Sequence, residues 1–388
     1  MKHNDCIIIH YDEISLKGNN RKWFENILIN NIKKHFSNLP FENISLKSAR
    51  LIINKIDSNQ IDLYKESLKN IVGTSSALIV KEIEQNLITI NKVCLSMITA
   101  YKPTSFRLTT KRNDKNFLLT SPEINSKVGA YIQSKINIPV NLKKPEMEII
   151  IELVDGKTYI GYDKINGFGG LPANSNEKAL SLLSGGIDSP VASFELIKRG
   201  VKLDFVHFHS YPATKKNSIH NVEKLCQKLT NYQLDSVLYK VPLLEIQQNI
   251  MKECDEKYWI ILFRRAMMKI ANYLAKKNHT LALITGDNIG QVASQTISNI
   301  YATSDSSELP ILRPLAGKNK NEIINIAKII GTYSISIEPF EDCCSFFVPE
   351  NPIIKANLNQ IFKYEKKINF NTLFNNTINQ IVIKKFKA

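Results

Sequence analysis

The feature that most constrains the fold is an apolar strand, a glycine turn and a helix in direct succession. Residues 178–200 read KALSLLSGGIDSPVASFELIKRG, with Gly185 and Gly186 at the turn and Gly200 placed to end the helix. Paired glycines let a backbone approach an anion, and the free N–H groups at a helix start donate to anionic oxygens. The segment therefore predicts a phosphate-binding turn. Because it lacks the lysine of a GK[ST] loop, a cradle for a γ-phosphate is not predicted.

The residues after Pro172 predict an α/β domain. Helical stretches separate apolar strands expected at residues 179–183, 202–208, 236–241 and 281–285. That alternation is typical of parallel strands with helices on both faces. In such sheets ligands bind beyond the carboxyl ends of the strands, which is where the glycine turn falls.

The N-terminal half predicts an α+β arrangement. Amphipathic helices such as residues 21–36 accompany short apolar strands at residues 6–10, 51–56, 147–153 and 159–162. Asp155 and Gly156 stand between two alternating runs, which is the strongest short signal for a hairpin of antiparallel strands. The Gly/Pro cluster at residues 167–172 marks the boundary between the two halves.

Length and charge set the broad class of protein. With 388 residues the chain is long enough for two or three domains. Its 51 Lys and Arg against 36 Asp and Glu give a net charge of +15, which favours nucleic acid as a partner. Lysine is abundant throughout, so charge alone raises this expectation only modestly. There is no signal pattern and no apolar window of about 18 residues, so a cytoplasmic protein with no membrane partner is expected.

The cysteines offer a candidate nucleophile. The chain has six, and none has CxxC spacing, which argues against a disulfide framework and a structural zinc site. Cys343 and Cys344 are adjacent in IEPFEDCCSFFVPENP, a segment whose prolines discourage a helix. A thiolate there could attack an activated carbon. The alternative is two incidental thiols, the usual role of an unpaired cysteine.

Longer stretches of the chain resemble a known family. SGGIDS after an apolar strand is the PP-loop signature and resembles the N-type ATP pyrophosphatases, which bind ATP and release pyrophosphate while they adenylate a substrate. Together with VHFHSYP, FRRAMMKIA, ALITGDNIGQVASQT and ILRPLAGKNKNEII, it resembles the ThiI family of tRNA 4-thiouridine synthetases. In the N-terminal half, EISLKGNNRKWFE and RLTTKRNDKNFLLTSPEINSKVGAYI are similar to the ferredoxin-like and THUMP RNA-binding segments of that family.

The resemblance implies an order of domains and an activity. We expect a ferredoxin-like domain at residues 1–60, a THUMP domain at 61–166 and a PP-loop adenylating domain at 173–388. ATP would adenylate O4 of the uridine at position 8 of tRNA, pyrophosphate would leave, and sulfur would displace AMP. Some relatives also serve thiamine thiazole synthesis, a role that the residues neither support nor exclude.

Carried over residue by residue, the family's ATP site falls beyond predicted strands and on one helix. It comprises Leu182, Leu183, Ser184, Gly185, Gly186, Ser189, His207, Phe208, Arg264, Gly286 and Gln295. Asp188 is the acidic member of the turn, and beside polyphosphate its carboxylate would hold Mg²⁺ or orient the attacked phosphoryl group. The alternative role for Asp188 is a helix N-cap, and for Arg264 a solvated or ion-paired surface group.

The resemblance also assigns RNA contacts and a sulfur carrier. The basic residues in the RNA-binding segments are Lys17, Arg21, Arg107, Lys111, Arg112 and Lys115. Without the resemblance, these residues are solvated charges. In the family, one cysteine of the proline-rich segment takes part in sulfur transfer, and its spacing to Pro352 favours Cys344 over Cys343.

The chain departs from the usual family pattern near its end. Many members carry a C-terminal rhodanese domain with a second persulfide cysteine, whereas this chain has no cysteine after Cys344. We therefore expect sulfur to come directly from a cysteine desulfurase or from a separate persulfide carrier. The resemblance also suggests a homodimer. The rival interpretations are another PP-loop reaction, such as amidation or 2-thiolation, and a tRNA-binding protein that has lost catalysis.

Overall fold

The chain divides after Pro172, at the end of the Gly/Pro cluster, into unit 1 (Met1–Pro172) and unit 2 (Ala173–Ala388). The computed structural model describes residues 4–339, 347 and 349–388. The candidate nucleophiles Cys343 and Cys344 therefore lie outside the described residues.

Unit 1 is built on a mixed sheet. Its strands run in the order β2-β3-β1-β4-β7-β6-β5. They are β1 (Asn4–Tyr11), β2 (Asn43–Lys47), β3 (Arg50–Asn54), β4 (Thr74–Glu84), β5 (Phe106–Arg112), β6 (Met147–Val154) and β7 (Lys157–Asn166). Neighbours pair antiparallel except β5 with β6, which are parallel. The expected hairpin is confirmed, because Asp155 and Gly156 join β6 to β7 with φ of 45° and 77°, as a type I′ turn requires.

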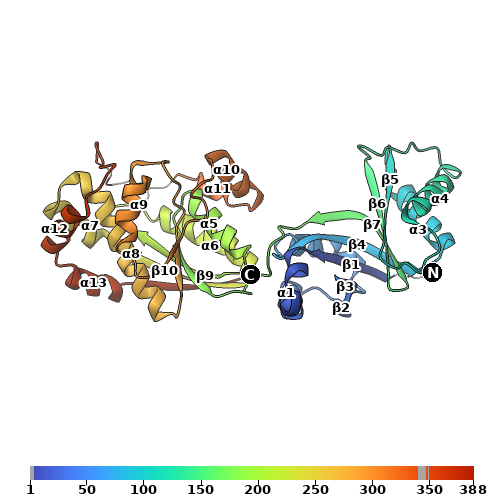
Figure 1. Ribbon diagram of the computed structural model, residues 1–388, viewed down its shortest axis with the longest axis horizontal. Coiled ribbons are helices and arrows are strands. Elements are labelled where there is room, and N and C mark those ends of the chain that lie inside the picture. Colours follow the sequence, from blue (N-terminus) through green and yellow to red (C-terminus); the bar gives the residue numbers. More distant parts are fainter. Residues whose placement is uncertain (1–3, 340–346, 348) are drawn as a thin grey trace. The chain divides into compact units, whose positions relative to one another are not determined.

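Two groups of helices pack on different parts of this sheet. The helices α1 (Arg21–His35) and α2 (Ile61–Leu68) enclose one apolar core with β1 and β3. A second core lies between β5, β6 and the helices α3 (Leu87–Tyr101) and α4 (Ser121–Gln133), which Figure 1 shows beside those strands. The helix expected at residues 21–36 is confirmed, ending one residue early.

A buried carboxylate links these two parts of unit 1. Glu152 on β6 is fully buried and pairs with His10 on β1 at 3.0 Å, Arg50 on β3 at 2.8 Å and Lys111 on β5 at 3.1 Å. Burial by itself raises the pKa of this carboxyl, but the hydrogen bond and charge of His10, with Lys111 and Arg50, outweigh it and lower the pKa to about 2. Glu152 is therefore charged at neutral pH.

Unit 2 is a doubly wound α/β unit. Its strands run in the order β12-β11-β8-β9-β10-β13. They are β8 (Lys178–Leu182), β9 (Lys202–His209), β10 (Asp235–Pro242), β11 (Ala282–Ile284), β12 (Ile311–Leu312) and β13 (Val382–Lys387). Pairs are parallel except β10 with β13, so the expected parallel sheet is confirmed. The order reverses between β8 and β11, which makes this point the topological switch of the sheet.

Helices cover both faces of this sheet, as predicted. Figure 1 shows α5 (Asp188–Ile197) and α6 (Asn217–Gln233) on one face, and α7 (Leu244–Glu253), α8 (Trp259–Lys277) and α9 (Ile297–Ser304) on the other. The helix α8 supplies much of the core on its face, with Phe263, Met268 and Ala271 buried. The helix α8 thereby places Arg264 near the carboxyl ends of β8 and β11.

The last part of the chain closes the unit. After β12 come α10 (Lys320–Ile329) and α11 (Tyr333–Ser336), then α12 (Leu358–Lys367) and α13 (Phe370–Asn379). The final strand, β13, pairs antiparallel with β10 and covers its edge.

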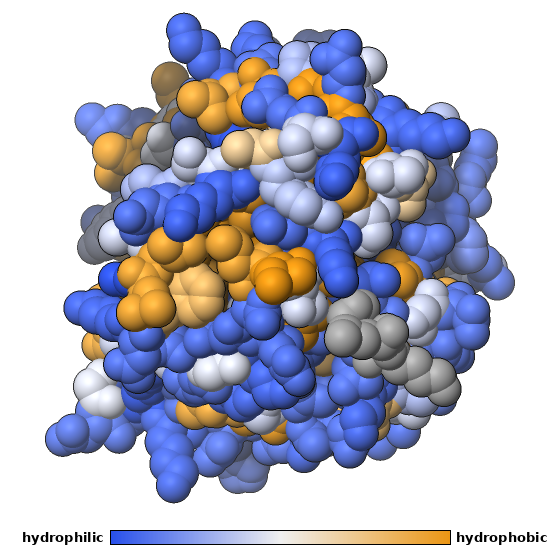
Figure 2. Space-filling view, turned by 90° about the vertical axis from the view of Figure 1, so that its right-hand side faces the viewer, coloured by the Kyte–Doolittle hydropathy of each residue, from blue (hydrophilic) through white to orange (hydrophobic). Residues whose placement is uncertain are grey.

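The described residues, 4–339, 347 and 349–388, include no helix that is long and apolar enough to cross a membrane. Figure 2 shows a face where hydrophilic residues cover most of the surface and hydrophobic residues gather in patches between them. Most of the large apolar side chains of the two units lie instead in the cores described above.

Candidate nucleotide-binding site

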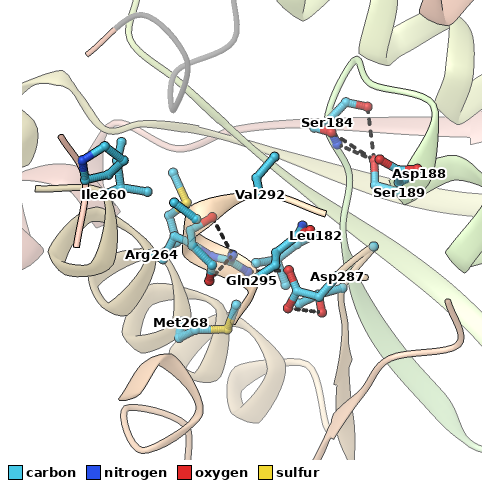
Figure 3. Close-up of a pocket in the computed structure, with 16 residues that line it drawn as sticks. Leu182, Ser184, Asp188, Ser189, Ile260, Arg264, Met268, Asp287, Val292 and Gln295 are labelled. Atoms are coloured by element: carbon cyan, nitrogen blue, oxygen red, sulfur yellow. Dashed lines mark hydrogen bonds and ion pairs between the residues drawn. The ribbon is translucent and has the colours of Figure 1, made fainter. Parts of the chain in front are cut away.

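A cavity of about 550 Å³ opens at the carboxyl ends of β8 and β11. Its wall contains Asp188 and six of the predicted ATP residues, namely Leu182, Ser184, Ser189, Arg264, Gly286 and Gln295. Figure 3 shows Ser184, Asp188 and Ser189 grouped at the turn, and Arg264, Asp287 and Gln295 together in another part of the wall. The cavity occupies the switch point, where doubly wound sheets bind ligands.

The glycine turn is closed by its two serines. The backbone N–H of Ser184 donates to Ser189 Oγ at 2.9 Å, and the two hydroxyl oxygens lie 3.0 Å apart. Ser189 Oγ also donates to the carbonyl oxygen of Ser184 at 3.2 Å. These bonds hold the backbone from Ser184 to the start of α5 in a tight loop, with Gly185 and Gly186 at its tip. The loop is therefore shaped before any anion binds.

Asp188 is the first residue of α5 and makes side-chain contacts with two distant segments. Lys320 Nζ lies 2.7 and 2.9 Å from its carboxylate oxygens, and Gln291 Nε2 donates to Oδ2 at 3.1 Å. The N-cap position of α5 is Ile187, with no side-chain cap bond. The alternative of a helix cap thus does not describe Asp188. Its carboxylate lies in the cavity wall, beside a cation from α10.

Gly286 lies against the turn itself. A Cβ at this position would approach the backbone N of Ser189 to 2.8 Å and its Cα to 2.9 Å, closer than packed carbon atoms tolerate. Only glycine lets the end of β11 approach the start of α5 in this way. The predicted residue Gly286 is therefore explained by close backbone contact.

Arg264 is ion-paired within the wall. Its Nη2 pairs with Asp287 Oδ1, and its Nη1 lies 3.4 Å from Ser294 Oγ. Only 13% of the side chain is exposed, so Arg264 is not a solvated surface group. Asp287 also accepts from Arg313 Nε at 3.1 Å and from the Thr285 hydroxyl at 2.8 Å.

Other predicted residues lie behind the wall. His207 is buried, and its Nδ1–H donates to the carbonyl oxygen of Leu183 at 3.0 Å, which ties β9 to the end of β8. Burial lowers the pKa of His207 to about 4, so its ring is neutral at pH 7. The Phe208 side chain belongs to the apolar core. Leu183, His207 and Phe208 can therefore meet a nucleotide through their backbone only.

The remaining wall suits an adenine nucleotide. Ile260, Met267, Met268 and Val292 supply an apolar side that fits the face of a base. In the described part of the chain, the Oε1 atom of Gln295 is buried with no hydrogen-bond partner. An orphaned acceptor of this kind is costly unless a ligand donor such as an amino group reaches it.

The side chains in the cavity wall could hold Mg²⁺ only together with phosphate oxygens of a bound nucleotide. Among the described residues, no group of three or more His, Cys, Asp or Glu could hold a metal ion. Mg²⁺ commonly uses one or two carboxylates and completes its shell with substrate phosphates and water. Asp188 is the carboxylate in this wall that no arginine neutralises, because Asp287 is held by Arg264 and Arg313.

Comparisons with known proteins give the family. Residues 174–370 match the family model of the thiamine biosynthesis protein ThiI. Residues 6–77 match the ThiI ferredoxin-like domain, and residues 84–163 match the THUMP domain. The chain belongs to the ThiI family.

Individual ThiI relatives are similar over nearly their whole length. The probable tRNA sulfurtransferases of Caldanaerobacter subterraneus subsp. tengcongensis and Coxiella burnetii are 38% and 40% identical, over 97% and 98% of this chain and 99% of each relative. The crystal structure of a 4-thiouridine synthetase in complex with RNA and bound ATP has a TM-score of 0.86 and 32% identity, and covers 98% of this chain and 99% of that one. The predicted fold, with ferredoxin-like, THUMP and PP-loop domains, is confirmed.

The RNA-binding candidates of this ThiI chain are mostly engaged in unit 1 itself. Arg107 and Lys111 lie on one side of β5, opposite Glu148 and Glu152 on β6, and pair with them at 2.7 and 3.1 Å. Both basic groups are thus partly neutralised by the neighbouring strand. An RNA phosphate would have to share these cations with the two carboxylates.

The other four candidates differ in how firmly they are held. Arg21 donates to Glu25 at 2.7 Å and to the Tyr11 hydroxyl at 2.6 Å. Arg112 donates to the carbonyl oxygens of Phe117 and Leu119, and the Lys17 ammonium lies over the Phe24 ring. Lys115 is exposed and has no ion pair within the described residues. Of the six, Lys115 is best placed for a phosphate contact without rearrangement.

Four cysteines of this ThiI chain lie within the described residues. Cys6, Cys94 and Cys226 are buried, and Cys254 is half-buried. Burial raises the pKa of Cys6 and Cys254 to about 11 and that of Cys226 to about 12, and it raises the pKa of Cys94 as well. None of these four is a ready thiolate at neutral pH.

Described residues on either side of the stretch with Cys343 and Cys344 contact the glycine turn and the cavity. Before it, Ser336 Oγ donates to the carbonyl oxygen of Gly186 at 3.3 Å. After it, Pro352 lines the cavity. Cys344 is eight positions along the chain from both Ser336 and Pro352, a span of at most roughly 29 Å for extended chain.

Some residues of the site were not among the predicted ones. Asp287, Thr285 and Met268 line the cavity, and Gln291 and Lys320 hold Asp188. Asp287 could have been found, because it follows a predicted strand at the carboxyl edge where ligands bind.

Proposed function

We propose that this protein is a tRNA 4-thiouridine synthetase, which uses ATP to adenylate O4 of the uridine at position 8 of tRNA and then replaces that oxygen with sulfur. The observation that carries the proposal is the cavity at the switch point, where the SGGIDS turn, Asp188 and Arg264 meet. The names of the relatives, tRNA sulfurtransferase and 4-thiouridine synthetase, support the same activity.

ATP binds with its phosphates at the turn and its base on the apolar side. The N–H groups at the start of α5 and the hydroxyls of Ser184 and Ser189 face the phosphates, and Arg264 compensates their charge. The orphaned Oε1 of Gln295 is available for an amino group of the nucleotide. Leu182, Gly286 and the backbone around Leu183 and Phe208 shape the floor.

Asp188 and Lys320 act on the polyphosphate as a pair. We assign Mg²⁺ to Asp188, where the ion would neutralise phosphate charge as pyrophosphate departs. Lys320 Nζ lies 2.7 Å from Asp188 and would be free to contact the phosphates if the carboxylate held the ion instead. Without the ion, the pair with Lys320 holds the carboxylate in the wall of the cavity.

The reaction has two displacement steps. In the first, uridine O4 attacks the α-phosphorus of ATP, and the bond to pyrophosphate breaks. In the second, the terminal sulfur of a persulfide on Cys344 attacks C4 of the uridine, and AMP leaves with the former O4. A second thiol, from Cys343 or from the donor protein, then reduces the remaining S–S bond and frees 4-thiouridine.

The remaining assignments follow from this activity. Residues 1–60 and 61–166 grip the tRNA, with Lys17, Arg21, Arg107, Lys111, Arg112 and Lys115 as candidate phosphate contacts. Residues 173–388 form the adenylating domain. A cysteine desulfurase or a persulfide carrier supplies sulfur in the cytoplasm, and the enzyme acts as a homodimer.

Nucleoside analysis tests the proposal. Unmodified tRNA is incubated with the protein, Mg-ATP, cysteine and a desulfurase, and its nucleosides are measured by mass spectrometry. We expect 4-thiouridine with the wild type and none with Asp188→Ala. The matched control is Asp62→Ala, since Asp62 is also an acid in the first turn of a helix but belongs to α2. No thionucleoside with the wild type, or 2-thiouridine in its place, would refute the proposed reaction.

A separate variant tests the sulfur carrier. In the same assay the Cys343→Ser, Cys344→Ser double variant should adenylate tRNA, seen as pyrophosphate release, without forming 4-thiouridine. The Cys254→Ser variant is the control, because its thiol has a raised pKa and lies outside the segment. Full thiolation by the double variant would remove both cysteines from the mechanism.

A further inference from the structure

Asp287 is a buried carboxylate in the wall of the proposed ATP cavity. It directly follows Gly286 at the end of β11, and only 4% of its surface is exposed. Both oxygens are occupied, Oδ1 by Arg264 from α8 and Oδ2 by Arg313 and Thr285. Figure 3 shows it beside Arg264 in the cavity wall.

A carboxylate at this place needs a physical reason. Burial penalises its charge, and a bound polyphosphate would repel it. The two arginines offset the burial, because they lower the pKa of Asp287 despite its desolvation. The chain thus maintains a negative charge inside a cavity that we assign to an anion, and it does so by pairing that charge with two arginines.

The geometry explains what the carboxylate does. Gly286 packs against Ser189 of the glycine turn so closely that no side chain fits between them. The next residue, Asp287, holds the guanidinium of Arg264, which comes from the separate helix α8. Arg313, after β12, holds the other oxygen and is itself fixed by a bond to Ser304 Oγ at 2.7 Å. The position of Arg264 relative to the turn is therefore set through Asp287.

We propose that Asp287 is a positioning residue for ATP, which acts by holding Arg264 in place in the wall of the cavity. The inference rests on the proposed function, since it takes ATP as the ligand. Arginine has a long, flexible side chain, and fixing it before binding removes an entropy cost from the binding step. Asp287 does not touch the nucleotide in this scheme.

The sign of one substitution separates this role from simple electrostatics. Asp287→Asn keeps the shape of the side chain and removes its charge. If charge were all that mattered, ATP would bind the variant more tightly, because a repulsive group has gone. If Asp287 positions Arg264, ATP binds the variant roughly tenfold more weakly, because a charge-assisted hydrogen bond is lost.

A double-mutant cycle tests whether the effect passes through Arg264. The Kd of ATP is measured by calorimetry for the wild type, Asp287→Asn, Arg264→Ala and the double variant. We expect Asp287→Asn to weaken binding in the wild type and to change it by less than about twofold when Arg264 is already absent. The steady-state assay should show a raised KM for ATP and a much smaller change in kcat.

The control is the neighbouring ion pair. Asp305 pairs with buried Arg265 at 2.9 Å but does not line the cavity. Asp305→Asn should therefore leave the Kd of ATP unchanged, even if it lowers the melting temperature. Should Asp287→Asn fail to fold, Arg313→Gln replaces it in the cycle, since it releases the other oxygen of Asp287 from outside the cavity, and it should weaken ATP binding in the same direction.

The outcomes are distinguishable from failure of the proposed function. If the wild type binds ATP and Arg264→Ala weakens binding, but Asp287→Asn binds as tightly as the wild type or more tightly, the positioning role is overturned. An equal loss with and without Arg264 also overturns it. If the wild type itself does not bind ATP, the proposed function fails first.

Discussion

Glu152 carries its charge in a part of unit 1 that water does not reach, and three basic residues from three strands depend on it. Replacing it by glutamine leaves His10, Arg50 and Lys111 without their common partner. We expect Glu152→Gln to lower the free energy of unfolding of unit 1 by about 3–5 kcal/mol, the usual cost of breaking a buried pair. In a Trp259→Phe background, urea unfolding followed at Trp23 reports on unit 1 alone.

The pH dependence of the stability of unit 1 provides a second test of the role of Glu152. The pKa of Glu152 is lowered from 4.5 to about 2 on folding, so its contribution is complete above pH 4.5 and is lost as the pH falls toward 2. Glu152→Gln should flatten the stability curve over this window. The exposed pair of Glu42 and Lys55 is the control, and Glu42→Gln should cost under about 1 kcal/mol. Equal effects of the two variants would contradict the prediction.

Gly286 allows another test at the same scale. In Gly286→Ala the added methyl group would collide with the backbone of Ser189, so the glycine turn must shift. We expect ATP binding, measured by calorimetry, to weaken by roughly tenfold or more, and the melting temperature to fall because the collision is with backbone atoms. Gly317→Ala is the matched control, because its Cβ would meet no atom within 4 Å. If both variants bind ATP like the wild type, Gly286 has no part in shaping the turn.

Single residues also mark how far sequence reasoning reaches. The composition of the glycine turn predicts phosphate binding, because paired glycines and serines at a helix start are typical of anion sites. Asp287 gives a weaker signal. Its place after a predicted strand suggests a ligand site, but its partners Arg264 and Arg313 lie 23 and 26 residues away along the chain and cannot be predicted from it. For Arg107 and Lys111, the sequence suggested a function but did not reveal their ion-pair partners. The family resemblance suggested RNA contacts for both residues, and only the register of β5 with β6 revealed the carboxylates opposite them.

Elements were predictable where their pattern was strong. The helix at residues 21–36, the hairpin at Asp155 and the parallel strands of unit 2 have clear periodicity or turn chemistry, and the structure confirms them. The strand β13 was missed because it contributes one buried side chain, Phe386, among exposed residues. The strand β5 was missed for a related reason, since charged residues alternate with its buried ones and shorten the apolar signal.

We expect the short strand β13 to be needed for the protein to stay soluble and unassociated. It covers the edge of β10, and its removal would leave the backbone groups of β10 unpaired. We expect a chain shortened after Ile381 to melt at lower temperature and to form larger species in size-exclusion chromatography. The full-length chain under the same conditions is the control. A shortened chain with unchanged melting and elution would show that β10 tolerates an open edge.

The whole molecule combines two units, each with a sheet and apolar cores of its own. We expect residues 1–172 and 173–388 to fold as separate fragments. The first should bind tRNA with an affinity that falls steeply with salt, because the contacts are to phosphates. The second should bind ATP without tRNA. Filter binding and calorimetry on the fragments check this, and fragments that lack a cooperative melting transition would contradict it.

For the whole molecule, the sequence predicted the order of the domains better than the details of the site. Motifs predicted an RNA-binding half followed along the chain by an adenylating half, and the family models match the chain in that order. What could not be predicted is how the cavity wall is shared among β8, β11, α5, α8 and the segment around Pro352. Such a wall depends on the packing of distant elements, which no local pattern encodes.

The burial of four thiols has a practical outcome. Because Cys6, Cys94, Cys226 and Cys254 have raised pKa values, each exists almost entirely as the unreactive protonated form at neutral pH. A mild alkylating reagent applied briefly to the folded protein should therefore leave these four thiols unmodified. None of the four has to be replaced before a spectroscopic label is attached to a cysteine elsewhere in the chain.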